Sequence, residues 1–170
     1  MLLTTKKIIK EWADYNGHMN LSYYILVFDI GAEVILSKFK MGEHSAKTTK
    51  KSTMVVETHT TYKQEVKEGD KVDVFISYFD HDNKRLHYKL EMFDKTKNTL
   101  SATTEILALY IDLNIRKVAE FEPEKIKIMN DYISNNEKNF NKEGLKFFYL
   151  LFWLSLQLRL LPKNQREKLP

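Results

Sequence analysis

The chain has 170 residues, the length of a single domain, and carries 27 Lys and Arg residues against 23 Asp and Glu residues, with no cysteine. The lack of cysteine excludes disulfides, thiolate zinc sites and a cysteine nucleophile. The net charge of +4 is modest and acidic residues are interspersed with basic ones, so the sequence lacks the charge pattern of a nucleic-acid-binding protein but is compatible with a phosphorylated ligand.

The first 39 residues predict a strand, a turn and a long helix. Residues 5–12 contain paired isoleucines and are expected to form a short strand, which Asp14-Tyr15-Asn16-Gly17-His18 ends with turn chemistry. In residues 21–39 apolar side chains recur every three or four positions, so we expect a helix that is buried over most of its surface. Gly31 is unfavourable inside a helix and is expected where a sheet approaches the helix backbone closely. Residues 1–7 lack the apolar core of a signal peptide, which indicates a cytoplasmic protein.

Four strands are expected next, after a polar loop at residues 40–51. They cover residues 52–66, 71–79, 84–94 and 99–112, where side chains alternate and β-branched and aromatic residues are enriched. The separators are short, so each strand is expected to pair with the next one as an antiparallel hairpin. In the third strand the apolar side chains share one face. The sheet is therefore expected to have one buried and one partly hydrated face, and to fold around the single long helix.

The last part of the chain changes composition twice. Glu122-Pro123-Glu124 begins a second helix that is expected to end near Ile133. We expect one domain over residues 1–133, a polar linker at residues 134–146, and an apolar and then basic segment at residues 147–170. The apolar part of that segment is shorter than the ~30 Å hydrocarbon core when it is helical, so a single membrane span is not expected. It is an interfacial membrane anchor, a helix packed on the body or on a partner, or an end with no selected role.

Several short motifs resemble one family. Asp14-Tyr15-Asn16-Gly17-His18-Met19-Asn20 resembles the Asp-x-x-Gly-His-x-Asn signature of the 4-hydroxybenzoyl-CoA thioesterase class. Residues 56–62, residues 84–87 and Thr104-Glu105 are similar to betainyl-CoA thioesterases, which occur alone or appended to carnitine dehydrogenase. The resemblance covers about residues 7–121. It implies an α+β hotdog fold, in which an antiparallel sheet wraps around a long central helix, and hydrolysis of an acyl-CoA thioester without a metal or organic cofactor.

The loop before the long helix carries the candidate catalytic residues. Thioester hydrolysis needs a nucleophile or general base, and hydrogen-bond donors directed at the developing oxyanion. The resemblance implies that Asp14 is the nucleophile or activates water, although an Asp before a helix is also a common turn residue. Backbone amides around Gly17, His18 and Met19 are expected to face the carbonyl oxygen, and Gly17 leaves room for the thioester. Asn20 is expected to cap the helix, and His18 either orients the loop or contacts substrate.

Substrate contacts are expected from residues near this loop and from one strand. Aromatic faces stabilise quaternary ammonium groups such as that of a betainyl ester. Glu57 and His59 are two residues apart in a strand and share one face, which is either a solvated edge or part of the site. The candidate substrate-binding residues are Trp12, Tyr15, Met19, Tyr24, Glu57 and His59. Glu105 lies among apolar residues and is expected to have a salt-bridge partner. The five histidines lack metal-ligand spacing, so no metal site is expected.

We expect an oligomer with an acyl-CoA substrate and no nucleic-acid partner. A lone hotdog sheet leaves an edge strand and an open face, and the resemblance implies that two sheets pair edge to edge, as a homodimer or tetramer with active sites at the subunit interface. Peripheral membrane contact through residues 147–170 is a further expectation. The alternative functions are a non-catalytic acyl-CoA or acyl-carrier binding module and a hotdog enoyl-thioester hydratase.

Overall fold

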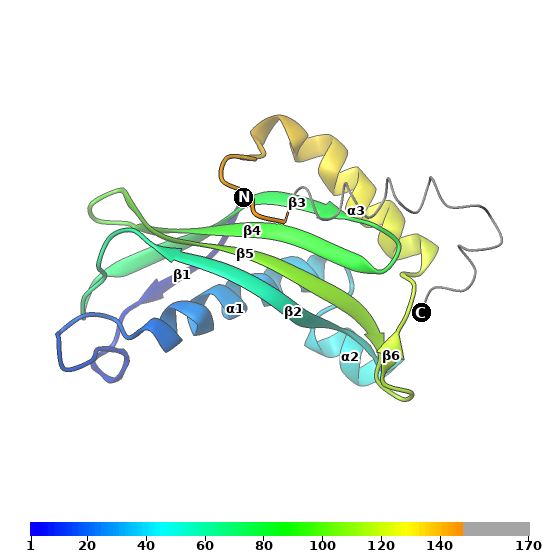
Figure 1. The fold of residues 1–170 in the computed structure, drawn as a ribbon, viewed down its shortest axis with the longest axis horizontal. Coiled ribbons are helices and arrows are strands. Elements are labelled where there is room, and N and C mark those ends of the chain that lie inside the picture. Colours follow the sequence, from blue (N-terminus) through cyan, green and yellow to red (C-terminus); the bar gives the residue numbers. More distant parts are fainter. Residues whose placement is uncertain (148–170) are drawn as a thin grey trace.

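The computed structural model describes residues 1–147, in which an antiparallel sheet curls around one long helix (Figure 1). The strands are β1 (Leu2–Lys7), β2 (Lys51–Tyr62), β3 (Lys71–His81), β4 (Arg85–Asp94), β5 (Thr99–Asp112) and β6 (Lys117–Val118). The helices are α1 (Leu21–Lys38), α2 (Glu43–Thr49) and α3 (Pro123–Asn136), with short 3-10 turns at Lys10–Trp12 and Glu137–Asn139. The predicted α+β hotdog fold, with its sheet around a central helix, is confirmed.

The order of the strands corrects one predicted hairpin. The sheet runs β1-β3-β4-β5-β2, and β6 adds to β5. The β3–β4 and β4–β5 hairpins were predicted, but β2 pairs with β5 and β3 pairs with β1, so β2 and β3 are not hairpin partners. The connection between them begins after Tyr62 and forms a bridge with the loop before α1, so the chain passes the start of α1 and joins the other half of the sheet. β2 is left as an edge strand.

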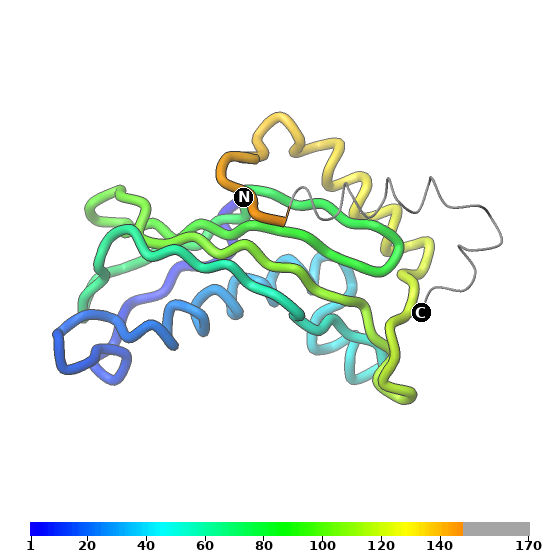
Figure 2. Tube along the Cα trace, viewed as in Figure 1, coloured from blue at the N-terminus to red at the C-terminus, as the bar shows by residue number. Residues whose placement is uncertain are grey.

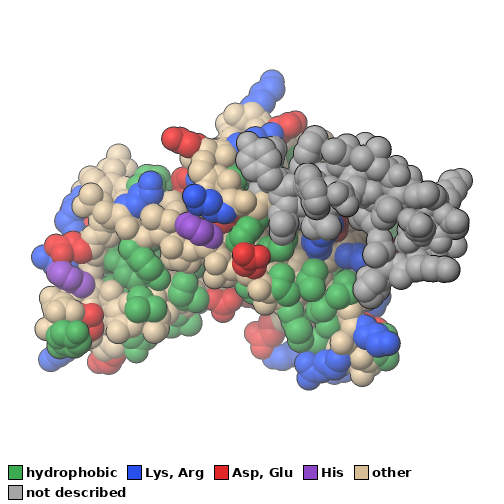
Figure 3. Space-filling model, viewed as in Figure 1, with side chains coloured by type: hydrophobic (Ala, Val, Ile, Leu, Met, Phe, Trp, Pro, Cys, Tyr) green, Lys and Arg blue, Asp and Glu red, His purple; other side chains and the backbone are tan. Residues whose placement is uncertain are grey.

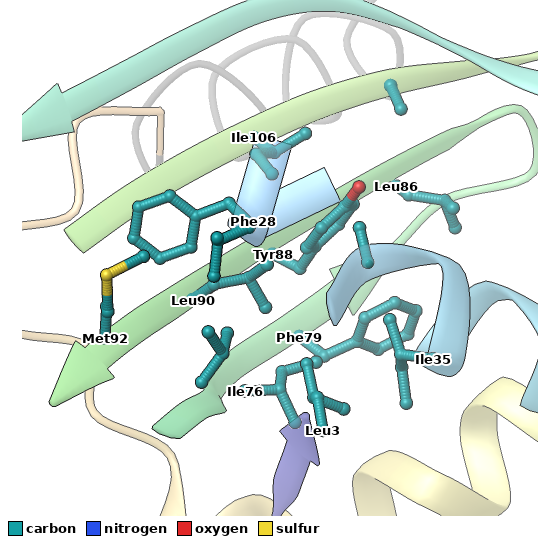
Figure 4. Packing of buried hydrophobic residues seen from close by; sticks show 14 of the residues in the cluster. Leu3, Phe28, Ile35, Ile76, Phe79, Leu86, Tyr88, Leu90, Met92 and Ile106 are labelled. Atoms are coloured by element: carbon teal, nitrogen blue, oxygen red, sulfur yellow. The ribbon is translucent and has the colours of Figure 1, made fainter. Parts of the chain in front are cut away.

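The core lies between α1 and one face of the sheet. Phe28 and Ile35 project from α1 among the side chains of β3 and β4 (Figure 4). Gly31 sits where the sheet comes closest, because a Cβ atom there would lie 3.1 Å from Cγ1 of Val74. The predicted reason for this glycine is therefore confirmed. The helix is not buried over most of its surface within one chain, since four apolar side chains of α1 are exposed: Leu21, Ile25, Leu26 and Val34.

Two segments of the first 51 residues differ from the prediction. β1 begins at Leu2, and Lys10–Trp12 form a 3-10 turn where the strand at residues 5–12 was expected. α2 lies within the predicted loop. It starts after Gly42, and the Glu33 carboxylate of α1 accepts the Glu43 N–H at 2.7 Å. This short surface helix has a polar sequence, and its start depends on a carboxylate from another helix, so local periodicity does not reveal it.

The end of the described chain covers part of the sheet face opposite α1, over β3, β4 and β5. Residues 139–147, here called the strap, run along this face after α3 (Figure 2). The Asn141 N–H donates to the Ser77 carbonyl at 2.7 Å, and Lys89 Nζ donates to the Glu143 carbonyl at 3.0 Å. His87 and Lys89, which the alternation placed on a partly hydrated face, are therefore buried. The predicted boundary at residue 133 falls inside α3, and the predicted linker at residues 134–146 is helix and strap; residues 148–170 lie outside the described part.

A buried charged group fastens the strap. Nε2 of His87 lies 2.7 Å from Oε1 of Glu105, and both side chains are buried. The Glu105 carboxylate also accepts the backbone N–H groups of Lys146 at 2.6 Å and Phe147 at 2.8 Å. Burial lowers the pKa of His87, although Glu105 beside it favours the charged form. We therefore assign a neutral His87 whose Nε2–H donates to Glu105, so the partner of Glu105 is a hydrogen-bonded histidine and not the expected salt bridge.

Candidate active site

The loop between the first 3-10 turn and α1 folds back on itself at Asp14. The Asp14 N–H donates to the His18 carbonyl and the Gly17 N–H donates to the Asp14 carbonyl, both at 2.9 Å. Gly17 has a φ of +78°, which side chains other than glycine adopt at a cost. No heavy atom lies within 4 Å of the position that a Gly17 Cβ would take. Within one chain, the turn rather than a close neighbour therefore requires this glycine.

The loop is fixed at both ends by neighbouring backbone. The Met19 N–H donates to the Val66 carbonyl at 2.7 Å, and the Asn20 N–H donates to the Trp12 carbonyl at 2.9 Å. Oδ1 of Asn20 accepts the Ser22 N–H at 3.0 Å, so Asn20 caps α1 as the sequence indicates. These bonds hold the loop at the N-terminus of α1.

The Asp14 carboxylate is half-buried and belongs to a turn. Its Oδ1 accepts the Asn16 N–H at 2.8 Å, and its Oδ2 lies 3.4 Å from Nδ2 of Asn16. Asp14 thus has the structural role of an Asp before a helix. That role leaves the carboxylate at the surface, within reach of an approaching ligand.

The amides that are available near Asp14 differ from those that the sequence indicates. The predicted set is Gly17, His18 and Met19, but the Gly17 N–H bonds to Asp14 and the Met19 N–H bonds to Val66. Within residues 1–147, the N–H groups of Tyr15, His18 and Leu21 have no hydrogen-bond acceptor. Leu21 is the first residue of α1, where unpaired amides carry the positive end of the helix dipole. These three groups are therefore the free donors of residues 14–21.

His18 is paired with a residue that the sequence analysis did not single out. Its Nε2 lies 2.7 Å from Oε2 of Glu65, whose other oxygen lies 2.9 Å from Nζ of Lys67. The hydrogen bond from Lys67 holds the pKa of the Glu65 carboxyl below its usual value. Glu65 was missed because it was assigned to the end of a strand, 47 positions beyond His18, where only the tertiary structure shows its partner.

The aromatic candidates divide between the loop surface and the core. Trp12 stacks on Tyr23 at 5.5 Å between ring centroids, and Tyr15 is 98% exposed. Tyr24 and Met19 are buried, and the Tyr24 hydroxyl accepts the Val66 N–H at 3.2 Å. Tyr15 therefore lies on the same loop as Asp14 and Trp12 ends the 3-10 turn just before it, while the buried side chains of Met19 and Tyr24 belong to the core. A direct contact of any of the four with substrate stays a prediction.

Glu57 and His59 lie away from this loop within one chain. His59 pairs with Glu105 across β2 and β5, and Glu57 pairs with Leu107. Paired residues share a face, so both side chains lie on the sheet face opposite α1, where they are exposed. Among the described residues, no hydrogen bond or ion pair joins either of them to residues 14–20.

The groove found in the described residues does not include the Asp14 loop. A groove of about 500 Å³ lies over β3 and β4 beside the strap, and its lining includes Phe75, Phe93 and Asn141 but no residue of the loop. The described residues contain no group of three or more His, Asp or Glu side chains that could hold a metal ion. No helix in this part of the chain is long and apolar enough to cross a bilayer.

Comparisons with known proteins place the chain among thioesterases. Residues 10–129 match the model of the thioesterase-like superfamily. The chain is 30% identical over 125 residues to a betainyl-CoA thioesterase from Pseudomonas aeruginosa. The aligned region covers 72% of this chain and 79% of the relative. Two solved structures share the fold. A Staphylococcus aureus protein in complex with CoA has a TM-score of 0.72 and 24% identity, covering 85% of this chain and 89% of that one. A putative thioesterase from Pseudomonas putida has a TM-score of 0.73 and 22% identity, covering 86% and 94%.

Proposed function

The chain belongs to the thioesterase-like superfamily and is an acyl-CoA thioesterase, and from this premise we propose that the Asp14 loop performs the hydrolysis and that betainyl-CoA is the substrate. The observation that supports the site most directly is that the Asp14 carboxylate lies on a loop with a free amide at His18, and that this loop leads to the free Leu21 amide at the start of α1. A carboxylate and adjacent donors are the groups that this chemistry requires.

Two routes use the same groups. In the first, a carboxylate oxygen of Asp14 attacks the thioester carbonyl carbon, the C–S bond breaks, coenzyme A leaves as thiolate, and water hydrolyses the resulting mixed anhydride. In the second, Asp14 accepts a proton from a water molecule that attacks the same carbon. In both routes negative charge develops on the carbonyl oxygen, where the N–H groups of His18 and Leu21 would stabilise it. Both routes yield the free acid and coenzyme A.

The proposal of betainyl-CoA rests on the relative from Pseudomonas aeruginosa and on the aromatic residues of the loop. The betainyl group carries a permanent positive charge on a trimethylammonium nitrogen. Aromatic faces attract such a cation by about 0.5–2 kcal/mol for each contact. Tyr15 on the Asp14 loop and Trp12 at the end of the preceding 3-10 turn are the residues that we propose for this contact. This substrate would place the protein in carnitine metabolism.

We also propose that the protein is a homodimer, or a tetramer of two such dimers. β2 is an edge strand, and apolar side chains of both β2 and α1 are exposed, as Figure 3 shows over the visible face. A long edge strand with exposed apolar residues pairs readily with another strand. A second copy on this edge would cover β2 and the exposed apolar residues of α1 together. In such a dimer the partner's β2 would lie near the Asp14 loop.

The edge proposal has a direct test in Val56→Lys. Val56 is exposed in β2, and a lysine there would bring like charges together across a two-fold pairing of β2 strands. We expect sedimentation equilibrium to show a smaller species than the wild type at equal concentration. Ile115→Lys, at an exposed apolar residue in the turn before β6, is the matched control and should leave the mass unchanged. Equal masses for wild type and Val56→Lys would refute the proposal that two copies pair through β2.

The proposals on location rest on sequence alone. We propose that the protein is cytoplasmic and contacts the membrane peripherally through residues 147–170, and the apolar and basic composition of that segment supports the membrane contact. Co-sedimentation with anionic vesicles, comparing the full chain with a chain that ends at Phe147, tests the contact. The shorter chain keeps the strap and its bonds to Glu105, so equal partition of the two would remove the proposal.

Thiol release tests the reaction and the substrate together. The panel should contain betainyl-CoA and short-chain, long-chain and aromatic acyl-CoA esters, with purified protein and no added metal. We expect turnover of at least one ester, with the highest kcat/KM for betainyl-CoA. Faster turnover of another ester would keep the reaction and discard the substrate. Stoichiometric binding of every ester without thiol release would contradict the proposed chemistry.

A further inference from the structure

We propose that Glu65 is a positioning residue for the Asp14 loop and that it acts through His18. This inference rests on the proposed function of that loop. Oε2 of Glu65 lies 2.7 Å from Nε2 of His18, which is a short, charge-assisted contact. The side chains are 51% and 40% exposed, respectively, so both remain accessible from the loop surface.

The Glu65 carboxylate is itself held in place. Its other oxygen lies 2.9 Å from Nζ of Lys67. The backbone around it is anchored to the core, because Val66 is buried and its N–H donates to the Tyr24 hydroxyl at 3.2 Å. The Lys67 N–H donates to Oδ2 of Asp70 at 3.0 Å. Glu65 therefore projects from a fixed segment and not from a free loop.

The same segment is docked on the candidate catalytic loop. His18 and Lys67 form an antiparallel bridge, and the Met19 N–H donates to the Val66 carbonyl at 2.7 Å. His18 is thus bound to the segment by its backbone and by its side chain. The His18 carbonyl in turn accepts the Asp14 N–H at 2.9 Å. This hydrogen bond links His18 directly to Asp14, so a displacement of His18 would also displace Asp14.

The pairing also determines what the imidazole of His18 can do. A carboxylate at Nε2 favours the tautomer with its proton on that atom. Nδ1 has no hydrogen-bond partner among residues 1–147. Nδ1 is therefore the ring atom that is left to face water or substrate. Glu65 would fix the orientation of this atom.

The test uses Glu65→Ala with Glu68→Ala as its matched control. Glu68 is an exposed carboxylate three residues further along the same connection, and no contact of its side chain is found in the described part of the chain. We expect Glu65→Ala to lower kcat for the best panel ester by on the order of 10- to 100-fold, with a smaller change in KM, because a misplaced group costs rate more than binding. Glu68→Ala should match wild type. Both variants should melt close to wild type, since an exposed ion pair contributes little to stability.

The kcat values of a double variant separate positioning from a merely structural role. His18→Gln should lower kcat for the same ester, and adding Glu65→Ala to it should cause no further loss. Wild-type rates in Glu65→Ala, or losses that multiply in the double variant, would overturn the inference. If Asp14→Asn is inactive while Glu65→Ala is normal, only this inference fails; if Asp14→Asn is fully active, the proposed function fails first.

Discussion

Asp14→Asn is expected to lower kcat/KM for the preferred acyl-CoA by about 100- to 10,000-fold while the fold stays intact. The proposed chemistry needs a carboxylate that attacks carbon or accepts a proton, and a neutral amide does neither well. The side-chain oxygen of asparagine can still accept the Asn16 N–H, which Oδ1 of Asp14 accepts at 2.8 Å. The substitution therefore removes the chemistry and keeps the turn. Thiol release and thermal melting of the same preparation measure the two effects.

Asp112→Asn is the matched control for this prediction. Oδ1 of Asp112 accepts the Asn114 N–H at 2.8 Å, which is the same type of turn in a different part of the molecule. We expect wild-type turnover from Asp112→Asn. An active Asp14→Asn would contradict the assignment of Asp14. If it is inactive, single turnover of the wild type in water labelled with heavy oxygen tests the anhydride route. Label in Asp14 itself demonstrates an anhydride that is hydrolysed at the aspartyl carbon, whereas a general base, or attack of water on the acyl carbon of the anhydride, leaves Asp14 unlabelled.

Glu105→Ala is expected to lower the free energy of unfolding by about 3–5 kcal/mol, because three donors lose their acceptor and each such loss costs about 1–3 kcal/mol. The carboxylate accepts hydrogen bonds from the Lys146 and Phe147 amides and from His87; the contacts with His87 and Phe147 are buried, and the contact with Lys146 is partly buried. Removing it leaves a buried imidazole and two amides without an acceptor. Nδ1 of His87 already lacks a partner in the described chain, so this histidine has no other bond to compensate. The loss should exceed that of an average surface substitution several-fold.

Urea unfolding of Glu105→Ala measures the loss, and hydrogen exchange locates it. The amides of Lys146 and Phe147 should exchange faster than in wild type, because their acceptor is gone. Glu120→Ala is the control, since this carboxylate is exposed and its ion pair with Lys84 is long, at 3.8 Å. Its free energy of unfolding should stay within about 0.5 kcal/mol of wild type. A Glu105→Ala midpoint equal to that of the control would mean that the strap is not fastened at this residue.

Local patterns were sufficient for most elements of the fold. The spacing of apolar residues predicted α1 within one residue of its observed ends, and alternation predicted β3, β4 and β5 closely. Both signals depend only on which face a side chain occupies, and repeated faces are encoded in neighbouring residues. Asn20 as a cap and Gly31 as a close approach follow from the same local chemistry.

The pairing of β2 and the covering of the outer face were not predictable in this way. A separator of three turn residues favours a hairpin, but the Tyr62–Lys71 connection is held by the loop before α1, which is distant in sequence. Likewise, alternation in β4 indicates only that His87 and Lys89 share a face. Whether that face meets water depends on the strap, whose polar sequence resembles a linker until Lys89 and Glu105 are seen to bind its backbone.

The sequence by itself determined the helix, the turn at Gly17 and the position of Asp14 before α1, because each depends on residues within a few positions of one another. The tertiary structure alone decided which amides remain free beside Asp14 and that Glu65 pairs with His18. The tertiary structure also separated Glu57 and His59 from the loop, since the register of β2 with β5 places both side chains on the sheet face opposite α1. These outcomes depend on contacts between segments far apart in the chain, and local residue patterns carry no information about which distant segment supplies the partner.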